Sequence, residues 1–351
     1  MINAKRHESI NNLPDTGIIS SSWLKMIAAA HNELGGDAYK EWPYLVECVR
    51  EQAIDRKYFK PMVDASYKRY GFLYLGALAR FINPAGTGSI FTGMMNAPTI
   101  RHGVAYLAAE SSRLDGKLEY NFGNYNSENV SQVSAWVIEW EYSLAERHQR
   151  EISHIVQASG IVKYFGMLHG EPPLASEVWV ELDLPYKDSY LLEKGLGVPV
   201  TFTDRNCIHV ASRYASRQSL HSHPDVWAEI ALYQGGITPK HWADRLALLV
   251  SVWDFNVNKP TVDEAASQLN LTGATLRNKL KAGGYVVKDV MKNAEMRRVR
   301  TSLRNGMSLA QAQKLYGYSN LRDLKANYKK YIDEDITKAR RQKVKDTRHY
   351  M

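Results

Sequence analysis

The stretch that decides the fold begins at residue 261 and reads TVDEAASQLNLTGATLRNKL. Thr261 and Glu264 have the spacing of a capping box, in which each side chain satisfies a backbone N–H, so we expect a helix directly after Thr261. Asn270 is a residue type that tolerates the sharp turn after a helix, and Thr272 can cap a second helix. The stretch therefore predicts a helix-turn-helix unit over residues 261–281.

The second helix of this unit has two distinct faces. Leu276 and Leu280 are four residues apart and point back toward the first helix, as helical spacing requires. The opposite face is polar and positive. The residues expected on it are Ala274, Arg277, Asn278 and Lys281.

The same pattern returns from residue 308 in SLAQAQKLYGYSNLRDLKANY. Gly317 marks the turn, and Ser319 or Asn320 caps the following helix, on which two apolar residues point inward. We expect this second helix-turn-helix unit over residues 308–330. Its outward residues are Arg322, Lys325 and Lys329.

A basic helix is expected between the two units, over residues 288–304. At ~1.5 Å per residue, it spans roughly 25 Å. Successive major-groove faces of DNA lie about 34 Å apart. With one unit at either end of this helix, a single chain would reach two successive grooves.

The paired units, the linking helix and the run LYGYS at residues 315–319 resemble the DNA-binding domain of the AraC/XylS family of transcriptional regulators. The resemblance covers roughly the last 100 residues and rests on two motifs at the right separation. It implies that Ala274, Arg277 and Asn278 meet base edges in the major groove. The DNA-contacting surface of the first unit then also includes Thr272 and Lys281.

The second unit departs from the family pattern at several positions. Gln313 stands where the family usually has an alanine between the helices, and Ala326 where it often has an arginine near DNA. Asp333 and Ile336 replace the closing glycine and proline. We therefore expect the outward cations of the second unit mainly to hold phosphate, while the first unit reads bases.

Positive charge is concentrated at the C-terminal end of the chain. The 351 residues carry a net charge of +8, with 21 Lys and Arg against 9 Asp and Glu from Lys259 onward, and 24 against 28 before it. A localised basic surface attracts phosphate, whereas a generally basic protein would show the excess throughout. The charge distribution predicts a basic C-terminal region that binds nucleic acid, attached to a mildly acidic N-terminal region.

The residues before this basic region predict an α+β domain. Helical patterns cover 22–34, 44–54, 69–81, 98–107 and 132–156, the last as one long amphipathic helix. Strand patterns cover 117–122 and 178–184, and a hairpin around 204–206 is expected to join strands 198–203 and 207–211. Helices first and strands later, without βαβ alternation, favour a mostly antiparallel sheet. A further helix is expected over 242–253, after a domain boundary near Gly235 and Gly236.

Short segments of this first domain resemble one AraC/XylS subgroup, whose N-terminal domain is of the arabinose-binding type. The segments are APTIRHGVAYL at 97–107, LDLPY at 182–186 and GVPVTF at 197–202. The resemblance implies a sensor domain, a small-molecule effector and activation by contact with RNA polymerase. Trp136 and Trp140 have a spacing more typical of a core than of a ligand pocket, so no effector-binding residue is nominated.

Other kinds of site have weaker support in the sequence. GTGSIF at residues 86–91 begins like a dinucleotide fingerprint, but a phenylalanine occupies the third glycine position. His221 and His223, near Asp225, lack a third metal ligand at a recognisable spacing. Cys48 and Cys207 are too few for a disulfide framework. We expect no enzymatic activity, no metal and no cofactor.

We therefore predict two domains. Residues 1–235 sense an effector or form a homodimer, and the all-α residues 236–351 bind double-stranded DNA as a sequence-specific transcriptional regulator, with activation as the resemblance implies. The alternative is a protein-interaction module whose basic surface meets an acidic partner. The start of the chain does not resemble a signal peptide and no apolar run is long enough to span a bilayer, so we expect a cytoplasmic protein without a membrane partner.

Overall fold

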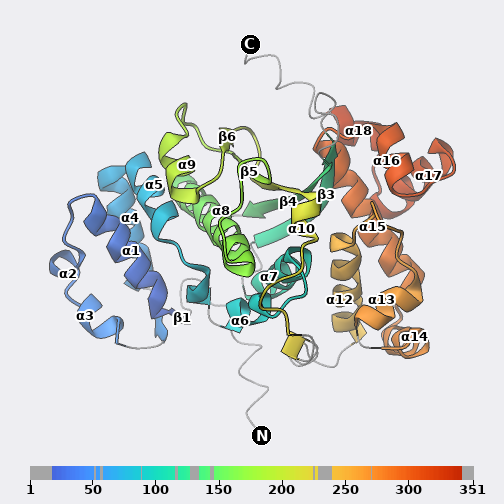
Figure 1. The fold of residues 1–351 in the computed structure, drawn as a ribbon, viewed down its shortest axis with the longest axis horizontal. Helices are drawn as coiled ribbons and strands as arrows, with labels where there is room; N and C mark the ends of the chain where they lie inside the picture. The colour runs from blue at the N-terminus through green and yellow to red at the C-terminus, as the bar shows by residue number, and fades with distance from the viewer. Residues whose placement is uncertain are drawn as a thin grey trace, which may run out of the picture. The chain divides into compact units, whose positions relative to one another are not determined.

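The structure is a computed structural model that describes residues 18–50, 53–55, 58–87, 89–114, 118–126, 134–142, 146–223, 226–227, 239–269 and 271–341. Figure 1 shows the course of the chain. The chain divides into two compact units. Unit 1 lies within Met1–Thr92, Glu110–Glu119 and Trp140–Ile208, and unit 2 within Gly93–Ala109, Tyr120–Glu139 and His209–Met351. Gly235 and Gly236, where the sequence places a domain boundary, lie outside the described residues.

Short helices dominate the first part of the chain. They are α1 Ser21–Glu33, α2 Ala38–Glu41, α3 Leu45–Cys48, α4 Phe59–Tyr70, α5 Phe72–Phe81, the 3-10 helix η4 Pro84–Thr87, α6 Ser89–Met95 and α7 Ile100–Leu114. Two short strands, β1 Ile18–Ser20 and β2 Ala53–Asp55, pair antiparallel. The single helix expected over 44–54 is therefore wrong, since α3 ends early and β2 follows it. The pattern over 69–81 spans two helices, because Gly71 adopts a φ of 54° between α4 and α5.

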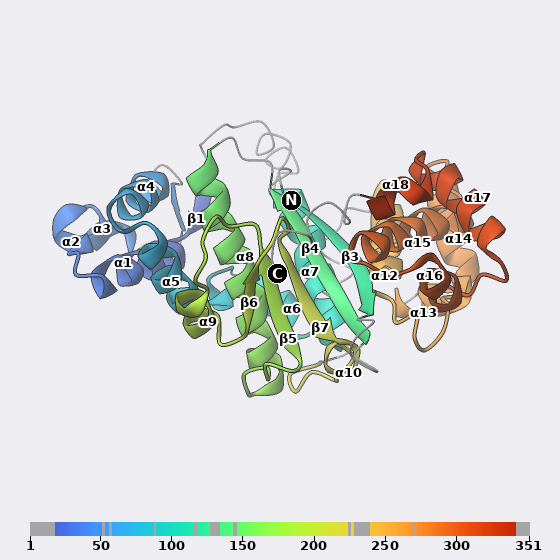
Figure 2. The same cartoon turned by 90° about the horizontal axis from the view of Figure 1, so that it is seen from above.

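A five-stranded sheet has the order β3-β4-β7-β5-β6. Its strands are β3 Leu118–Asn126, β4 Ser134–Tyr142, β5 Val178–Leu182, β6 Val200–Phe202 and β7 Cys207–Ala211. The sheet is mostly antiparallel, as expected, although β5 and β6 run parallel with Val180 opposite Val200. Figure 2 shows the strands side by side. The mixed α+β class predicted from the sequence is confirmed.

Two predictions about this sheet are wrong. Residues 134–142 form strand β4 and not part of a long helix; the helix, α8 Arg147–His169, begins after it. Every residue from Ala135 to Trp140 is buried, so the strand lacks the polar alternation that distinguishes a half-buried strand from an apolar helix. The expected hairpin of β6 and β7 is also absent, because β6 pairs with β5 while β7, buried at all five positions, lies between β4 and β5.

In unit 1, α5 is the central helix and packs against α1, α8 and α9 Tyr190–Leu196. Two glycines allow α9 to approach α5 closely. A Cβ atom at Gly195 would lie 2.9 Å from both the Cβ of Ala79 and the carbonyl oxygen of Gly76. The strand predicted over 178–184 is confirmed as β5, in which Val178, Val180 and Leu182 are buried and the residues between them are half-buried.

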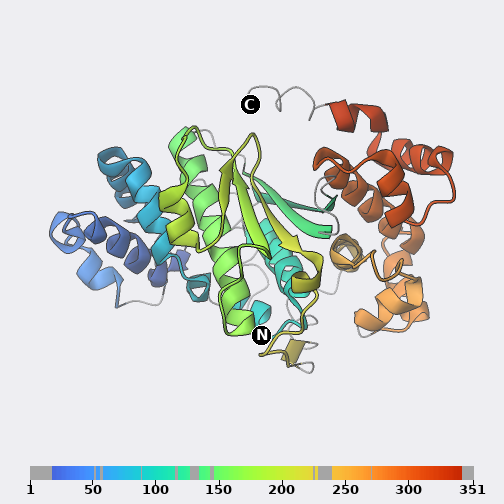
Figure 3. The same ribbon diagram turned by 45° about the horizontal axis from the view of Figure 1, so that its top comes forward.

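The last part of unit 2 is entirely helical from α12 onward. After α10 Ser212–Ala215 come α12 Pro239–Val252, α13 Val262–Gln268, α14 Gly273–Lys281, α15 Val287–Arg304, α16 Leu309–Leu315, α17 Leu321–Ile332 and α18 Ile336–Arg341. The helices share one apolar core that includes Leu246, Leu276, Met296, Leu303 and Tyr328. Figure 3 shows the first helix pair (α13 and α14, light orange) and the second helix pair (α16 and α17, red) at opposite ends of α15. Within the described part of the chain, none of the helices combines the length and the apolar character needed to cross a membrane.

Candidate nucleic-acid interface

The first helix pair begins with the capping box predicted from the sequence. The hydroxyl of Thr261 accepts the backbone N–H of Glu264 at 3.2 Å, and the Glu264 carboxylate accepts the backbone N–H of Thr261 at 2.8 Å. These hydrogen bonds lower the pKa of the Glu264 carboxyl group. Asn270, proposed for the turn, lies outside the described residues. The box fixes where α13 begins, and with it the start of the unit.

Helix α14 is held at its first turn by a cap and by close packing. The hydroxyl of Thr272 accepts the backbone N–H of Thr275 at 3.1 Å. A Cβ atom at Gly273 would lie 1.9 Å from Oδ1 of Asp263 on α13, so a larger residue here would displace that exposed carboxylate. Leu276 and Leu280 are fully buried, which fixes the rotation of the helix about its axis. The residues left exposed on α14 include Ala274, Arg277, Asn278 and Lys281.

Arg277 has one ionic neighbour within the described residues. Its Nη2 lies 4.0 Å from Oδ1 of Asp263, and the two side chains are 55% and 80% exposed. An exposed ion pair of this length contributes little, because water and salt screen it. The guanidinium of Arg277 is therefore free to leave Asp263 for a stronger anionic or hydrogen-bonding partner.

The second helix pair repeats the architecture of the first. Ser308 and Gln311 form a reciprocal capping box, with hydrogen bonds of 3.2 and 2.7 Å. Gly317 takes a φ of 65° in the turn. Of the two candidates for the next cap, it is Asn320 that serves, since its side chain accepts the backbone N–H of Asp323 at 2.9 Å.

The departure from the AraC/XylS pattern at Gln313 has a structural explanation. Its amide donates hydrogen bonds of 3.2 Å to the carbonyl oxygens of Tyr318 and Ser319. The longer side chain thus supports the turn between α16 and α17 by hydrogen bonding, where an alanine would only fill space. Asp333, at the position of the family glycine, ends α17 in the left-handed conformation with a φ of 57°.

The cationic face of α17 is exposed. Leu324 and Tyr328 are fully buried and orient the helix, as the sequence predicts. The hydroxyl of Tyr328 donates a hydrogen bond to Glu334, and burial together with this carboxylate raises the pKa of the tyrosine. The outward cations are Arg322, Lys325 and Lys329.

A buried carboxylate joins the second helix pair to α15. Glu295 of α15, 3% exposed, accepts hydrogen bonds from Lys259, Lys292 and the hydroxyl of Tyr318 at 3.3, 3.1 and 2.6 Å. Lys259 also donates to the carbonyl oxygen of Tyr316. We call these side chains the Glu295 cluster. Sequence patterns do not reveal it, because its members lie on three separate segments.

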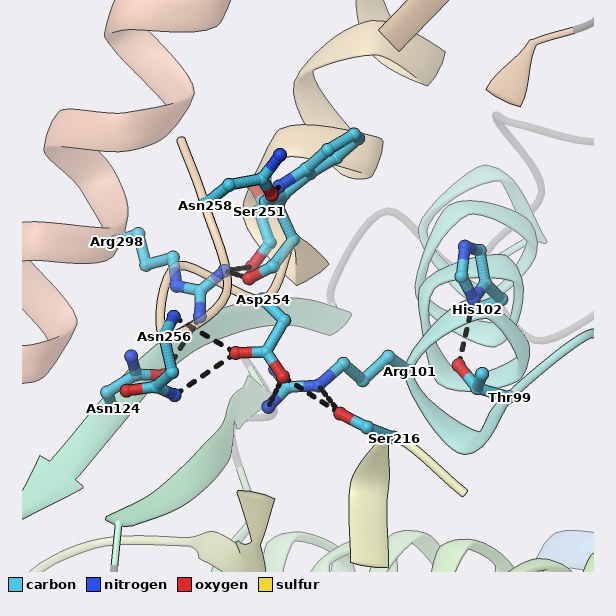
Figure 4. A network of polar contacts seen from close by, with 11 residues as sticks. Thr99, Arg101, His102, Asn124, Ser216, Ser251, Asp254, Asn256, Asn258 and Arg298 are labelled. Atoms are coloured by element: carbon cyan, nitrogen blue, oxygen red, sulfur yellow. Dashed lines mark hydrogen bonds and ion pairs between the residues drawn. The ribbon is translucent and has the colours of Figure 1, made fainter. Parts of the chain in front are cut away.

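A buried arginine anchors the other side of α15. Arg298 donates to the carbonyl oxygens of Ser251 and Trp253 at the end of α12, and to Oδ1 of Asn124 on β3 at 2.9 Å (Figure 4). The backbone N–H of Asn124 in turn donates to the hydroxyl of Ser302 at 2.8 Å. The helix that carries both pairs is therefore fixed to α12 and β3 within unit 2.

The remaining sequence candidates lie in several different segments of the described chain. His221 and His223 lie in a segment without regular secondary structure, and Asp225 is outside the described residues. The segment 86–91 begins in η4 and ends in α6, and Gly88 is not among the described residues. Cys48 and Cys207 are buried, and neither forms a disulfide within the described part of the chain. Trp136 and Trp140 are fully buried in the core.

Comparison with known proteins finds a similar solved structure. No family model and no curated protein matches the sequence. The structure is similar to the crystal structure of the transcriptional regulator CdpR from Pseudomonas aeruginosa, with a TM-score of 0.41 and 16% sequence identity. The similarity covers 79% of this chain and 91% of that one.

Proposed function

We propose that this chain is a DNA-binding transcriptional regulator that contacts duplex DNA through α14 and α17. One observation carries most of the support: two capped helices with exposed basic faces lie at opposite ends of α15 and share its core. Helix α15 has 18 residues, so it is ~27 Å long. With a helix pair at each end, this length suits successive major-groove faces about 34 Å apart.

Helix α14 is the proposed reader of bases. An arginine bonds well to the major-groove edge of guanine and an asparagine to that of adenine, and Arg277 and Asn278 present both groups from the same exposed surface. Ala274 is small enough to meet a thymine methyl group. Thr272 and Lys281 flank these residues and are assigned to the neighbouring backbone of the DNA.

Helix α17 is proposed mainly to hold phosphate. Arg322, Lys325 and Lys329 supply positive charge, while Ala326 between them has no group that can hydrogen-bond to a base edge. Lysine acts as a flexible point charge and suits a phosphate better than a fixed pattern of donors and acceptors. Helix α14 would thus supply specificity for the base sequence, and α17 would mainly supply affinity for the DNA backbone.

The sequence resemblance to the AraC/XylS family supports the finer parts of the proposal. By that resemblance, residues 236–351 form the DNA-binding domain and residues 1–235 the domain that senses an effector or forms a dimer. Activation through contact with RNA polymerase belongs to the same proposal. We assign the chain no catalytic role.

The proposal is tested by selecting bound duplexes from a randomised library with the full chain, and by competition binding at two salt concentrations. For a selected duplex, Arg277→Ala should cost about 1–3 kcal/mol and relax preference at one base position. Affinity for random DNA should stay nearly unchanged. The matched control is Arg213→Ala, which removes an exposed arginine outside the helix pairs.

Lys325→Ala and Lys329→Ala should behave differently. Each should weaken selected and random duplex alike and reduce the slope of log affinity against log salt by about one unit for each phosphate that the variant no longer neutralises. Lys187→Ala, an exposed lysine of unit 1, is the control. If Lys325→Ala shifts base preference while Arg277→Ala does not, the division of labour is refuted. If no duplex is bound in a salt-dependent way, the basic surface serves an acidic protein partner instead.

A further inference from the structure

A cavity of about 250 Å³ lies within unit 2, between α7, Ser216 and the segment that connects α12 to α13. Its size is slightly below the range of roughly 300–1,000 Å³ that is usual for ligand pockets. Both apolar and polar side chains line it. Its walls include Arg101, His102, Leu249, Trp253, Asp254 and Gln268.

The charges beside this cavity do not balance among the described residues. Arg101 and Arg298 are 3% and 1% exposed, the charge of Arg298 lowers the pKa of Arg101, and the carboxylate of Asp254 acts on both arginines. Burial lowers the pKa of Arg101 to about 9, against the opposing effect of Asp254. Two buried guanidinium groups and one carboxylate leave one excess positive charge. A buried charge without a partner is costly, so an added anion would be stabilised here.

The hydrogen bonds of Arg101 are also incomplete. Its Nη1 and Nη2 atoms are buried without a hydrogen-bond partner in the described structure, and its Nε contacts the hydroxyl of Ser216 at 3.4 Å. Nη2 lies 3.7 Å from Oδ2 of Asp254, which is too long for a hydrogen bond. Asp254 instead accepts from Ser216 and Asn256 at 2.9 and 3.1 Å (Figure 4). The missing partner of Arg101 is therefore an acceptor.

We propose that this cavity binds a small organic carboxylate, with its carboxylate group on the guanidinium of Arg101 and its apolar part against Leu249 and Trp253. A carboxylate matches the planar donors of an arginine in a bidentate arrangement and supplies the missing negative charge. Binding draws the guanidinium toward the cavity and away from its long contact with Asp254. The apolar wall favours an organic anion over inorganic phosphate.

The position of the cavity gives the ligand a regulatory role, and this part rests on the proposed function. Gln268 is the last residue of α13, and its side-chain oxygen lies 3.4 Å from Nε2 of His102 on α7. Because both residues line the cavity, a ligand bound in it contacts α7 and the first helix pair together. Occupancy would change the affinity of α14 for DNA, and DNA would change the affinity for the ligand by the same factor.

The test is isothermal titration of the full chain, without DNA, with cyclohexanecarboxylate, phenylacetate and pentanoate and with the uncharged amide of each. At least one carboxylate should bind about tenfold or more tightly than its amide, and more tightly than inorganic phosphate. Because no DNA is present, the titration tests ligand binding alone, and its result is independent of the proposed function. If no carboxylate binds better than its amide, or if phosphate binds equally well, the proposal is overturned.

Variants locate the binding at the cavity. Gln268→Glu places a negative charge at the exposed wall and should weaken carboxylate binding at least about fivefold while leaving amide binding unchanged. Ser267→Glu, one residue away on the exposed surface of α13 and not part of the wall, is the matched control and should change neither. Arg101→Met should abolish the preference for carboxylate over amide. Equal effects of Gln268→Glu and Ser267→Glu would overturn the assignment even if Arg101→Met fails to fold.

Discussion

Replacing Glu295 by glutamine is expected to destabilise the attachment of the second helix pair to α15. The change keeps the shape of the side chain and removes its charge. In the native protein this side chain is buried, and its carboxylate accepts hydrogen bonds from two lysines and one tyrosine on three segments. Glutamine retains one acceptor oxygen, which can still receive the Tyr318 hydroxyl. It cannot compensate the charges of Lys259 and Lys292.

The expected destabilisation follows from these interactions. A hydrogen bond to a charged group contributes about 1.5–3 kcal/mol, and removing one partner of a fully buried ion pair costs about 3–5 kcal/mol. Lys259 and Lys292 are 42% and 24% exposed, so both can turn toward water once the carboxylate is gone. Hydration of the two lysines makes the cost smaller than the about 3–5 kcal/mol expected for a fully buried ion pair. We expect Glu295→Gln to lower the free energy of unfolding by about 2 kcal/mol.

The assay is urea denaturation of the full chain, with hydrogen exchange used to assign the change to α16 and α17. Glu171→Gln, the same substitution at an exposed position of unit 1, should have almost no effect. A double-mutant cycle with Lys292→Met isolates the ionic contribution, because contacting residues show coupling that distant ones lack. A destabilisation below about 0.5 kcal/mol, or full additivity with Lys292→Met, would refute the reasoning.

Three further outcomes are expected. The full chain should self-associate, because under the proposed function a single chain would make few base contacts and dimerisation would raise the effective concentration at a doubled site; a monomer in sedimentation both alone and on DNA would contradict this. Burial lowers the pKa of His154 from 6.5 to about 4, so the unfolded chain binds the proton first and stability should fall as pH drops across that interval. His154→Gln should remove about 2–3 kcal/mol of this dependence in urea titrations at pH 4 and 7. Asp333→Gly should stabilise α17 by about 0.5–1 kcal/mol and Asp333→Ala should not, because glycine adopts the left-handed conformation without strain.

Local features of the helical region could be predicted from the sequence because their physical causes are local. The capping boxes at Thr261 and Ser308 each involve residues three apart, so spacing alone identifies them. The inward leucines of α14 follow from helical periodicity in the same way. For the cap of α17, the sequence leaves only two candidates, Ser319 and Asn320. Short-range hydrogen bonding and periodicity therefore determine this part of the structure.

The sheet and the buried polar contacts depend on residues far apart in the sequence. A strand covered on both faces, such as β4, has no alternation to reveal it, and the apolar run around Trp136 matches a helix equally well. The long helix predicted over residues 132–156 is wrong for this reason, since residues 134–142 form strand β4. The partners of Glu295 and Arg298 likewise become apparent only after folding. Composition shows that the end of the chain is basic, but not which of its charges are buried.

The contacts of α15 reach residues that lie far before position 236 in the sequence. A Cβ atom at Gly123 of β3 would lie 2.8 Å from the side chain of Thr301 and 2.9 Å from the backbone nitrogen of Ser302, so this approach requires glycine. The next residue, Asn124, bonds to both Arg298 and Ser302. A fragment beginning at residue 236 would deprive Arg298 of its acceptor Asn124 and Asp254 of Arg101. The spacing of the two helix pairs is set by a helix whose polar contacts reach back to β3. Under the proposed function, DNA affinity measured on the full chain and on such a fragment should therefore not be equated.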